Sequence, residues 1–170
     1  MTAWTLATLG LGGNIGEPRL AMAEALAAID RHADCRVVAV SRLYRTPPWG
    51  RTDQADFFNA CASLETALAP KALLDLCLSI ERDMKRERIE RWGPRTIDID
   101  VLTYGDVSSP DPALSIPHPR MTERGFVLMP LADIAPDLAV EGRTVRAWLD
   151  DADVAGIAVA DADRDWWRRA

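Results

Sequence analysis

The sequence predicts an α+β fold in which an antiparallel sheet carries helices on one face. Short runs that alternate apolar and polar residues mark the strands, and two longer runs with helical spacing mark the helices. Their order is β-α-β-β-α-β, the split arrangement of a ferredoxin-like α/β sandwich. The 170 residues suffice for one domain, which we expect to cover residues 1–150 and to end in irregular C-terminal additions.

The first half of this pattern is a strand, a helix and a second strand. Residues 5–11 are short and apolar and predict the first strand, and the glycine-rich run 10–16 predicts a tight exit from it. That run is not a dinucleotide fingerprint, because Ile15 stands at the last glycine position of G-x-G-x-x-G, and no Walker A lysine follows. Residues 17–32 predict a helix, and the β-branched and aromatic residues of 36–45 predict the next strand.

The second half begins after an aperiodic loop, residues 46–56. Residues 57–66 alternate and predict a strand, and residues 70–84 predict a helix that begins at a proline. The charged segment 83–92 then predicts a mobile loop that flanks a site together with the first loop. A final strand follows from residue 97 and completes the β-α-β-β-α-β order.

The remainder of the chain is irregular, with two short helices. The first is expected over residues 123–131, with Phe126 and Leu128 turned inward and an end near Pro130. The second is expected over 144–150, capped by its first threonine.

The tail, residues 151–170, leaves two interpretations open. It either docks on the body through the adjacent Trp166 and Trp167 or is disordered.

Composition narrows the class of protein. The hydrophobic fraction is 48% and the charged fraction 27%, which is typical of a globular domain, and the net charge of −6 argues against nucleic-acid binding. Three cysteines without a paired motif are expected to be small buried residues in a reducing compartment. The sequence shows neither a signal peptide nor a membrane-spanning run, so we expect a cytoplasmic protein without membrane contact.

The final strand carries the strongest chemical signal. Asp98 and Asp100 alternate with apolar residues, and in a strand such residues point to the same face. Paired carboxylates repel each other unless a cation lies between them, and nearby arginines suit a polyphosphate. The segment from Glu81 to Arg95 holds six basic and four acidic residues, a net charge of +2. It is read either as an anion site or, on charge alone, as a solvated helix end laced with ion pairs.

A second signal lies on the strand predicted over residues 57–66. Phe57 and Asn59 share one face, where a flat aromatic ring stands beside an amide. Such a pair could stack on a planar heterocycle and hydrogen-bond its edge. The alternative is an edge-strand pair covered by the preceding loop.

Residues 91–100, Arg-Trp-Gly-Pro-Arg-Thr-Ile-Asp-Ile-Asp, resemble the signature of the 6-hydroxymethyl-7,8-dihydropterin pyrophosphokinase family. Four further stretches resemble the family in order and spacing, and together they extend over roughly residues 5–150. They are Gly10-Leu11-Gly12-Gly13-Asn14, Tyr44-Arg45-Thr46-Pro47-Pro48, Phe57-Phe58-Asn59-Ala60 and Ile116-Pro117-His118, with Arg124-Gly125-Phe126 just after.

The resemblance implies a reaction and its cofactors. Pyrophosphate would pass from the co-substrate ATP to the hydroxymethyl group of the pterin and leave AMP, as a step of folate biosynthesis. Two magnesium ions would be held by Asp98 and Asp100 and would bridge the triphosphate.

The resemblance also implies roles for individual residues. The catalytic set would be Arg86, Arg88, Arg95, Asp98 and Asp100. The ATP-binding set would be Arg91, Arg95, Val101, Ser115, His118 and Arg124. The pterin-binding set would be Thr46, Trp49, Phe57, Asn59, Trp92 and Phe126, with the ring stacked between the two phenylalanines.

The chain departs from the family pattern at a few positions. Trp49 is larger than the usual aliphatic residue of the pocket wall, and Lys85 stands where a glycine often precedes the Arg-x-Arg pair. Gly13 and Phe57 are also less common choices. Neither aspartate is affected.

Two other functions fit the sequence less well than catalysis. A pterin- or nucleotide-binding module without activity would lack an aspartate or the arginines, yet all are present. An RNA-binding ferredoxin-like module would need a basic surface, which the net charge opposes. We expect small-molecule substrates and a monomer. The sequence identifies no general base, and His118 is a candidate by residue type only.

Overall fold

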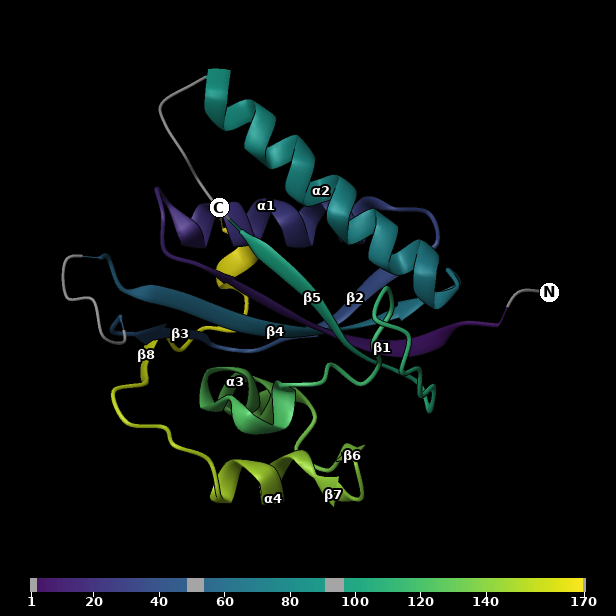
Figure 1. The fold of residues 1–170 in the computed structure, drawn as a ribbon. Coiled ribbons are helices and arrows are strands. Elements are labelled where there is room, and N and C mark those ends of the chain that lie inside the picture. Colours follow the sequence, from purple (N-terminus) through teal and green to yellow (C-terminus); the bar gives the residue numbers. More distant parts are fainter. Residues whose placement is uncertain (1–2, 49–53, 91–96, 170) are drawn as a thin grey trace.

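The architecture is an antiparallel sheet covered by helices on both faces (Figure 1). The computed structural model describes residues 3–48, 54–90 and 97–169, and it gives no side-chain detail for 86–90. The sheet has six strands in the order β5-β1-β4-β3-β8, with β2 also paired to β4. The strands are β1 (Thr5–Gly13), β2 (Cys35–Val40), β3 (Leu43–Thr46), β4 (Phe57–Thr66), β5 (Asp98–Tyr104) and β8 (Ala158–Asp161). All of their pairings are antiparallel, which confirms the predicted fold class.

Helices lie on both faces of this sheet. The predicted pair, α1 (Pro18–Arg31) and α2 (Pro70–Glu90), lies on one face. On the opposite face lie α3 (Gly125–Ile134) and, beyond it, α4 (Val145–Asp150) (Figure 1). The C-terminal additions thus form a second helical layer, which corrects the expectation that helices lie on one face only. The short elements of this part of the chain are η1 (Met121–Glu123), β6 (Ala139–Val140), β7 (Arg143–Thr144) and η2 (Trp166–Arg168).

The central strand β4 is buried on both sides because of these two layers. Ala62 and Leu64 belong to the core beneath α1 and α2. Cys61, on the other face, belongs to a second core with Leu128 and Leu131 of α3. Cys61 and Ser63, on the face of β4 that starts with Phe57, are therefore buried.

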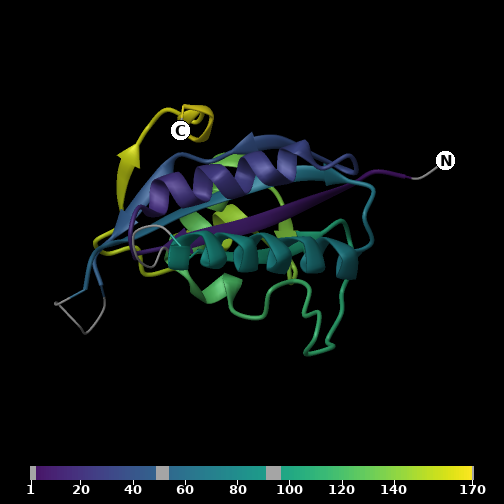
Figure 2. The same cartoon turned by 90° about the horizontal axis from the view of Figure 1, so that it is seen from above.

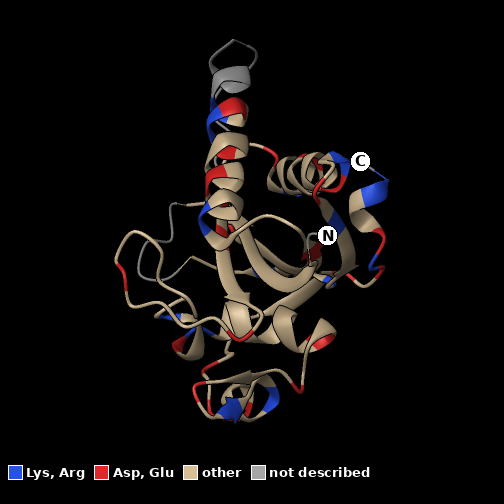
Figure 3. Ribbon diagram, turned by 90° about the vertical axis from the view of Figure 1, so that its right-hand side faces the viewer, with Lys and Arg blue, Asp and Glu red and all other residues tan. Residues whose placement is uncertain are grey.

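The helix α2 is longer than predicted, and this corrects the expected loop over 83–92. It continues past Met84 to Glu90, so the described part of that segment is helical. The reason is composition: the residues from Lys85 to Glu90 include neither glycine nor proline and are mostly strong helix formers. Acidic and basic residues are interspersed along the described turns of α2 (Figure 3), and residues 91–92 lie outside the described part of the chain.

The glycine run of β1 is also a correction. The sequence predicted a turn at residues 10–16, but β1 continues to Gly13 and pairs with β4 along the way, for example Gly12 with Asn59. The strand requires glycine at position 12 because the side chain of Asn59 occupies the space that a Cβ would take. The chain leaves the strand only afterwards, where Gly16 adopts a φ of 71°.

Two further element boundaries differ from the prediction. The strand expected over 36–45 is interrupted at Ser41 and Arg42, which separate β2 from β3. The helix expected over 123–131 begins at Gly125 and continues through Pro130 to Ile134. Because Pro130 lacks an N–H, the helix loses only the hydrogen bond that this group would donate to the carbonyl four residues earlier. The expected cap of α4 is confirmed by the bond from the Ala147 N–H to Thr144 Oγ1, 3.1 Å.

The C-terminal tail docks on the body. Its strand β8 pairs with β3, and the following turn lies beside α1 (Figure 2). Trp166 is 0% exposed, and its indole N–H donates to the Ser41 carbonyl at 2.9 Å, exactly where β2 and β3 separate. The sequence left open whether the tail docks on the body or is disordered, and in the structure it docks.

Candidate active site

A cavity of about 460 Å³ opens between the start of α3 and the adjoining ends of β1, β4 and β5. Its walls come from five separate stretches of sequence. Seven of the residues predicted as site residues line it: Thr46, Phe57, Asn59, Asp98, Asp100, Arg124 and Phe126. The structure thus brings together residues that are up to eighty positions apart in the chain.

The floor of the cavity is the glycine-rich end of β1. Gly10 and Gly12 line it, and a Cβ added to Gly12 would lie 2.6 Å from Asn59 Nδ2. The missing side chain at Gly12 therefore makes the room that the Asn59 amide occupies. Asn14 then donates from Nδ2 to Gln54 Oε1 and to the Ala55 carbonyl, both at 3.3 Å, and ties the end of β1 to the loop before β4.

Aromatic rings form the apolar part of the cavity wall. Phe57 comes from the start of β4 and Phe126 from the first turn of α3, and both are half-buried. The guanidinium carbon of Arg124 lies 5.6 Å from the centre of the Phe126 ring, within the range of a cation–π contact. One wall of the cavity therefore combines an aromatic face with a positive charge.

Thr46 is a further residue on the wall of the same cavity. It is 3% exposed, and its hydroxyl oxygen is buried with no hydrogen-bond partner among the described residues. Buried hydroxyl groups in folded proteins are nearly always paired. A buried, unpaired hydroxyl on a cavity wall is suited to a bound molecule.

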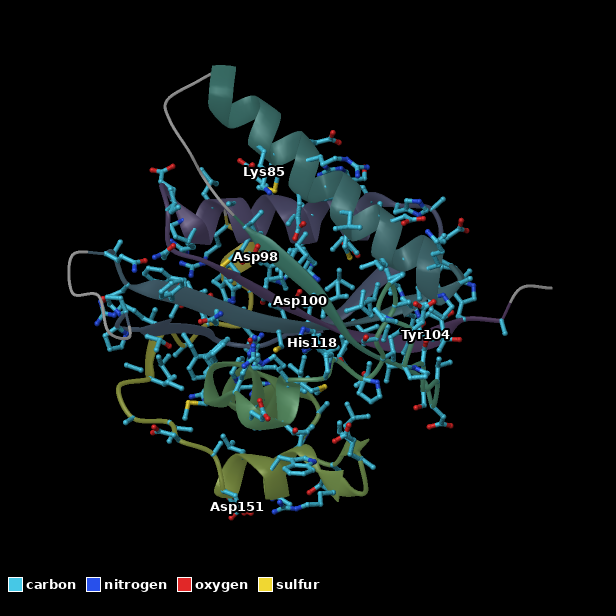
Figure 4. The ribbon with its side chains drawn as sticks, in the orientation of Figure 1. Lys85, Asp98, Asp100, Tyr104, His118 and Asp151 are labelled. Carbon is cyan, nitrogen blue, oxygen red and sulfur yellow. The ribbon has the colours of Figure 1, made fainter. Side chains whose placement is uncertain are left out.

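Asp98 and Asp100 form the acidic part of the site. Both side chains are exposed on the cavity side of β5, while Ile99 between them is buried (Figure 4). Surrounding protein raises the pKa of Asp100, and the charge of Asp98 adds to this effect, whereas His118 and Arg124 oppose it. Among the described residues, neither carboxylate has an ion pair or a hydrogen bond to another side chain.

His118 lies beside this pair without lining the cavity. Its backbone N–H donates to the Leu102 carbonyl at 2.9 Å, which holds the loop against β5. Its Nδ1 accepts from the Arg120 N–H at 3.2 Å, so the neutral ring carries its proton on Nε2. Burial lowers the pKa of His118, and Arg124 and Arg120 lower it further against the pull of Asp100. The ring is therefore a neutral N–H donor near neutral pH.

Two of the residues assigned to ATP by resemblance lie away from the cavity. Val101 is buried with Ile99 in the core beneath α2. The Ser115 hydroxyl donates to the Asp111 carbonyl at 3.1 Å and closes a turn of its own loop. Neither side chain lines the cavity.

The remaining predicted residues cannot be placed by their side chains. Arg86 and Arg88 lie in the last turns of α2, where the backbone is described but the side chains are not. Trp49, Arg91, Trp92 and Arg95 lie outside the described residues.

Sequence reasoning missed one carboxylate close to the site. Glu81, on α2, accepts a hydrogen bond from the Ile99 N–H through Oε1 at 2.7 Å. Burial raises the pKa of Glu81, with smaller contributions from the charges of Asp98 and Asp100. The helical pattern gave no signal for this contact, because it joins positions that come together only in the folded chain.

Within the described residues, no three histidine, cysteine or carboxylate side chains come together as a ready cage for a metal ion. None of the described helices combines the length and the apolar character needed to cross a bilayer.

Comparison with known proteins identifies the family. Residues 8–136 match the model of the family described as 7,8-dihydro-6-hydroxymethylpterin-pyrophosphokinase. A Methylorubrum extorquens protein named 2-amino-4-hydroxy-6-hydroxymethyldihydropteridine pyrophosphokinase is 51% identical over 153 residues, which is 90% of this chain and 97% of that protein. A Pseudomonas aeruginosa protein of the same name is 48% identical over 136 residues, 79% of this chain and 84% of that protein.

A solved structure agrees with the fold. The Plasmodium falciparum HPPK-DHPS triple mutant with SDX-DHP superposes with a TM-score of 0.70 over 88% of this chain, at 19% identity. This chain covers 44% of that longer one, so the likeness concerns the fold alone. From the family match and the two close relatives, the chain belongs to the 7,8-dihydro-6-hydroxymethylpterin-pyrophosphokinase family, whose members are enzymes of folate biosynthesis.

Proposed function

We propose that this protein transfers pyrophosphate from ATP to the hydroxymethyl group of 6-hydroxymethyl-7,8-dihydropterin, with AMP as the second product. The observation that carries the proposal is that two chemically different sets of residues line the same cavity. One set is aromatic and amide, and the other is acidic and basic. The first suits a flat heterocycle and the second suits a metal-bound polyphosphate.

The pterin would bind against the aromatic set. Phe57 and Phe126 offer ring faces for stacking, and Asn59 offers both an acceptor and a donor to the edge of the heterocycle. The unpaired hydroxyl of Thr46 supports a further hydrogen bond from this wall. Trp49 and Trp92 belong to the same proposed pterin site.

The acidic pair fits magnesium. Mg²⁺ prefers oxygen ligands and is usually held by one or two carboxylates together with water and substrate phosphates. Asp98 and Asp100 point to one side of β5 with no cationic partner among the described side chains, so their charges remain available to such an ion. Two ions held there would neutralise charge on the triphosphate when bound.

The basic residues would hold the phosphates. Arg124 lines the cavity, and His118 offers a neutral N–H donor beside Asp100. The same proposed set includes Arg86, Arg88, Arg91 and Arg95. The first two lie in the last turns of α2, whose earlier turns contact β5. Arginine suits this task because its fork of donors matches phosphate oxygens.

The proposed reaction forms one phosphorus–oxygen bond and breaks another. The hydroxyl oxygen of the pterin bonds to the β-phosphorus of ATP, and the bond from that phosphorus to the bridging oxygen of the α-phosphate breaks, so AMP leaves with the electron pair. The O–H bond of the hydroxyl group also breaks, and its proton passes to solvent water. The residues of the cavity serve mainly to align the attacking and leaving oxygens and to stabilise the charge between them.

The test is incubation of the protein with MgATP and 6-hydroxymethyl-7,8-dihydropterin, followed by separation of the nucleotides. AMP and a pterin diphosphate in equal amounts are expected. ADP as the nucleotide product would contradict pyrophosphoryl transfer and indicate an ordinary kinase. Binding of both substrates with no turnover would instead favour the alternative of a non-catalytic binding module.

A further inference from the structure

We propose that Glu81 is a positioning residue that sets the place of the two aspartates relative to α2, by holding the peptide group between them. This inference rests on the proposed function, because it assigns Asp98 and Asp100 to the reaction. The residue pair involved is Glu81 of α2 and Ile99 of β5, joined through Oε1 and the backbone N–H at 2.7 Å.

The contact falls on the free side of an edge strand. In the described part of the chain, β5 is the last strand of the sheet and pairs only with β1. Alternate N–H groups of such a strand point away from the sheet and need another partner. The Ile99 N–H is one of these, and the carboxylate of Glu81 satisfies it.

The position of Ile99 makes this bond more than a local detail. Asp98 and Asp100 are its immediate neighbours and point to the opposite face from its buried side chain. Fixing the Ile99 peptide therefore fixes the backbone that carries both carboxylates. The acceptor oxygen of residue 81 is therefore the feature that this role requires, rather than the charge of the carboxylate.

The same bond connects the two charged halves of the proposed site. Glu81 lies on α2 a little more than one turn before Arg86, and α2 continues without a break to Glu90. The helix thus carries proposed phosphate-binding arginines, and the strand carries proposed metal-binding aspartates. Glu81 is the described side chain that hydrogen-bonds one element to the other at this point.

The location of Glu81 argues against a purely electrostatic stabilising role. It is half-buried and lies close to the negative charges of Asp98 and Asp100, which disfavours a further carboxylate there. Lys85, one turn later, compensates in part. A residue that only stabilised the fold would gain from being uncharged or farther away.

Two substitutions separate the hydrogen bond from the charge. Glu81→Gln keeps an acceptor oxygen at the same reach and removes the charge, whereas Glu81→Asp keeps the charge and withdraws the acceptor by one methylene group. The matched control is Asp75→Ala, which removes an exposed carboxylate of the same helix that pairs only with Lys71 among the described residues. Glu81→Ala removes both the acceptor and the charge and completes the series, provided that circular dichroism shows it to be folded.

The readouts are hydrogen exchange at the Ile99 amide and the magnesium dependence of turnover. Glu81→Asp is expected to speed Ile99 exchange by about tenfold and to raise the magnesium concentration for half-maximal activity by about tenfold, the effect of losing one hydrogen bond. The KM for the pterin should stay within about twofold. Glu81→Gln and Asp75→Ala should resemble the wild type in all three measurements.

Two results would overturn the proposal. If Glu81→Gln were impaired and Glu81→Asp were normal, charge rather than position would be the role of Glu81. If both variants kept wild-type exchange and magnesium dependence, Glu81 would have no role in positioning. Failure of the proposed function is distinguishable, since the wild type would then form no AMP while the exchange of Ile99 still reported on the hydrogen bond.

Discussion

Among single side chains, Thr46 presents a buried hydroxyl with no partner in the described residues. Thr46→Val keeps the shape and removes the hydroxyl. The substitution breaks no hydrogen bond among the described residues and removes the cost of burying an unpaired hydroxyl. The free energy of unfolding should therefore stay the same or rise by up to about 1 kcal/mol. The KM for the pterin should rise about tenfold, since a ligand hydrogen bond is lost.

Steady-state kinetics and urea denaturation of the same protein check this expectation. A stability gain with unchanged KM for both substrates would show that the hydroxyl does not face a ligand. Ser79 of α2, which is half-buried and does not line the cavity, supplies the matched control as Ser79→Ala.

Asp100 is expected to oppose stability while serving activity. Although the side chain reaches the cavity, the surrounding protein partly desolvates the carboxylate and raises its pKa, so the folded protein holds the carboxyl proton more tightly than the unfolded chain does. The ionised carboxylate therefore lowers stability at neutral pH, and this cost disappears as the pH falls below the ordinary carboxyl pKa. Asp100→Asn should raise the melting temperature at neutral pH, whereas the two proteins should converge in acid.

The same substitution should lower kcat by about a hundred- to a thousandfold, the loss expected when one electrostatic element of a reaction centre is removed. Calorimetry across pH and the AMP assay measure the two effects. Near-normal AMP formation by Asp100→Asn would remove Asp100 from the proposed metal site. Asp75→Asn should change neither quantity.

Between elements, Asp133 joins α3 to the strand break between β2 and β3. Its carboxylate accepts from the Arg42 backbone N–H and Nε, both at 3.1 Å, from Arg42 Nη2 at 3.0 Å and from the Tyr44 hydroxyl at 2.8 Å. Burial alone would raise the pKa of Asp133, but the bonds from Arg42 and Tyr44 outweigh it and hold the pKa below the ordinary range. Burial raises the pKa of Tyr44 to about 12, with the bond to Asp133 adding to it.

Asp133→Asn should lower the free energy of unfolding by about 2 kcal/mol at neutral pH, because charge-assisted bonds to a largely buried carboxylate are weakened. A depressed folded-state pKa gives stability that is complete above the unfolded carboxyl pKa and is lost as the pH falls through the folded one. The difference from the wild type should therefore shrink in acid. Urea denaturation across pH measures it, and a constant difference would contradict the assignment.

The tail constrains the start of α3. A Cβ added to Gly125 would collide with the Asp153 carbonyl oxygen and crowd Val154. Gly125 stands between Arg124 and Phe126, so a displacement there moves two residues of the cavity wall. Gly125→Ala should lower the free energy of unfolding by about 2 kcal/mol and raise the KM for both the pterin and ATP.

A second variant tells whether the backbone is responsible. Val154→Ala removes the side chain that the new Cβ would touch but leaves the Asp153 carbonyl in place. The double variant should remain as impaired as Gly125→Ala, as judged by kinetics and urea denaturation. If the double variant recovered wild-type stability and kinetics, the clash would lie with the Val154 side chain and not with the Asp153 backbone.

Prediction from the sequence succeeded where local pattern decides the structure. The alternation that starts at Phe57 gave β4 with its observed bounds, and the i, i+2 spacing put Asp98 and Asp100 on one face. It was wrong about the end of α2, because a charged segment was read as a loop although its residues favour helix. The bond between Glu81 and Ile99 was missed, since it depends on how a helix lies against a strand eighteen residues later.

For the whole molecule, the three thiols report on the integrity of the fold. Cys35, Cys61 and Cys77 are all buried and free. Burial raises the pKa of each thiol, that of Cys77 to about 12, so little reactive thiolate forms near neutral pH. A thiol reagent such as Ellman's should label none of them in the native protein and all three in urea. Fast labelling of one thiol in the native state would reveal local opening around it.

The strand β8 has a consequence for the behaviour of the protein in solution. It occupies the side of β3 that would otherwise present unpaired N–H and C=O groups to other molecules. A chain shortened before residue 158 would keep every residue of the proposed site but expose that template for intermolecular strand pairing. Such a chain should aggregate on storage, whereas β8, being four residues long and ending at Asp161, offers a poor surface for further strands to join.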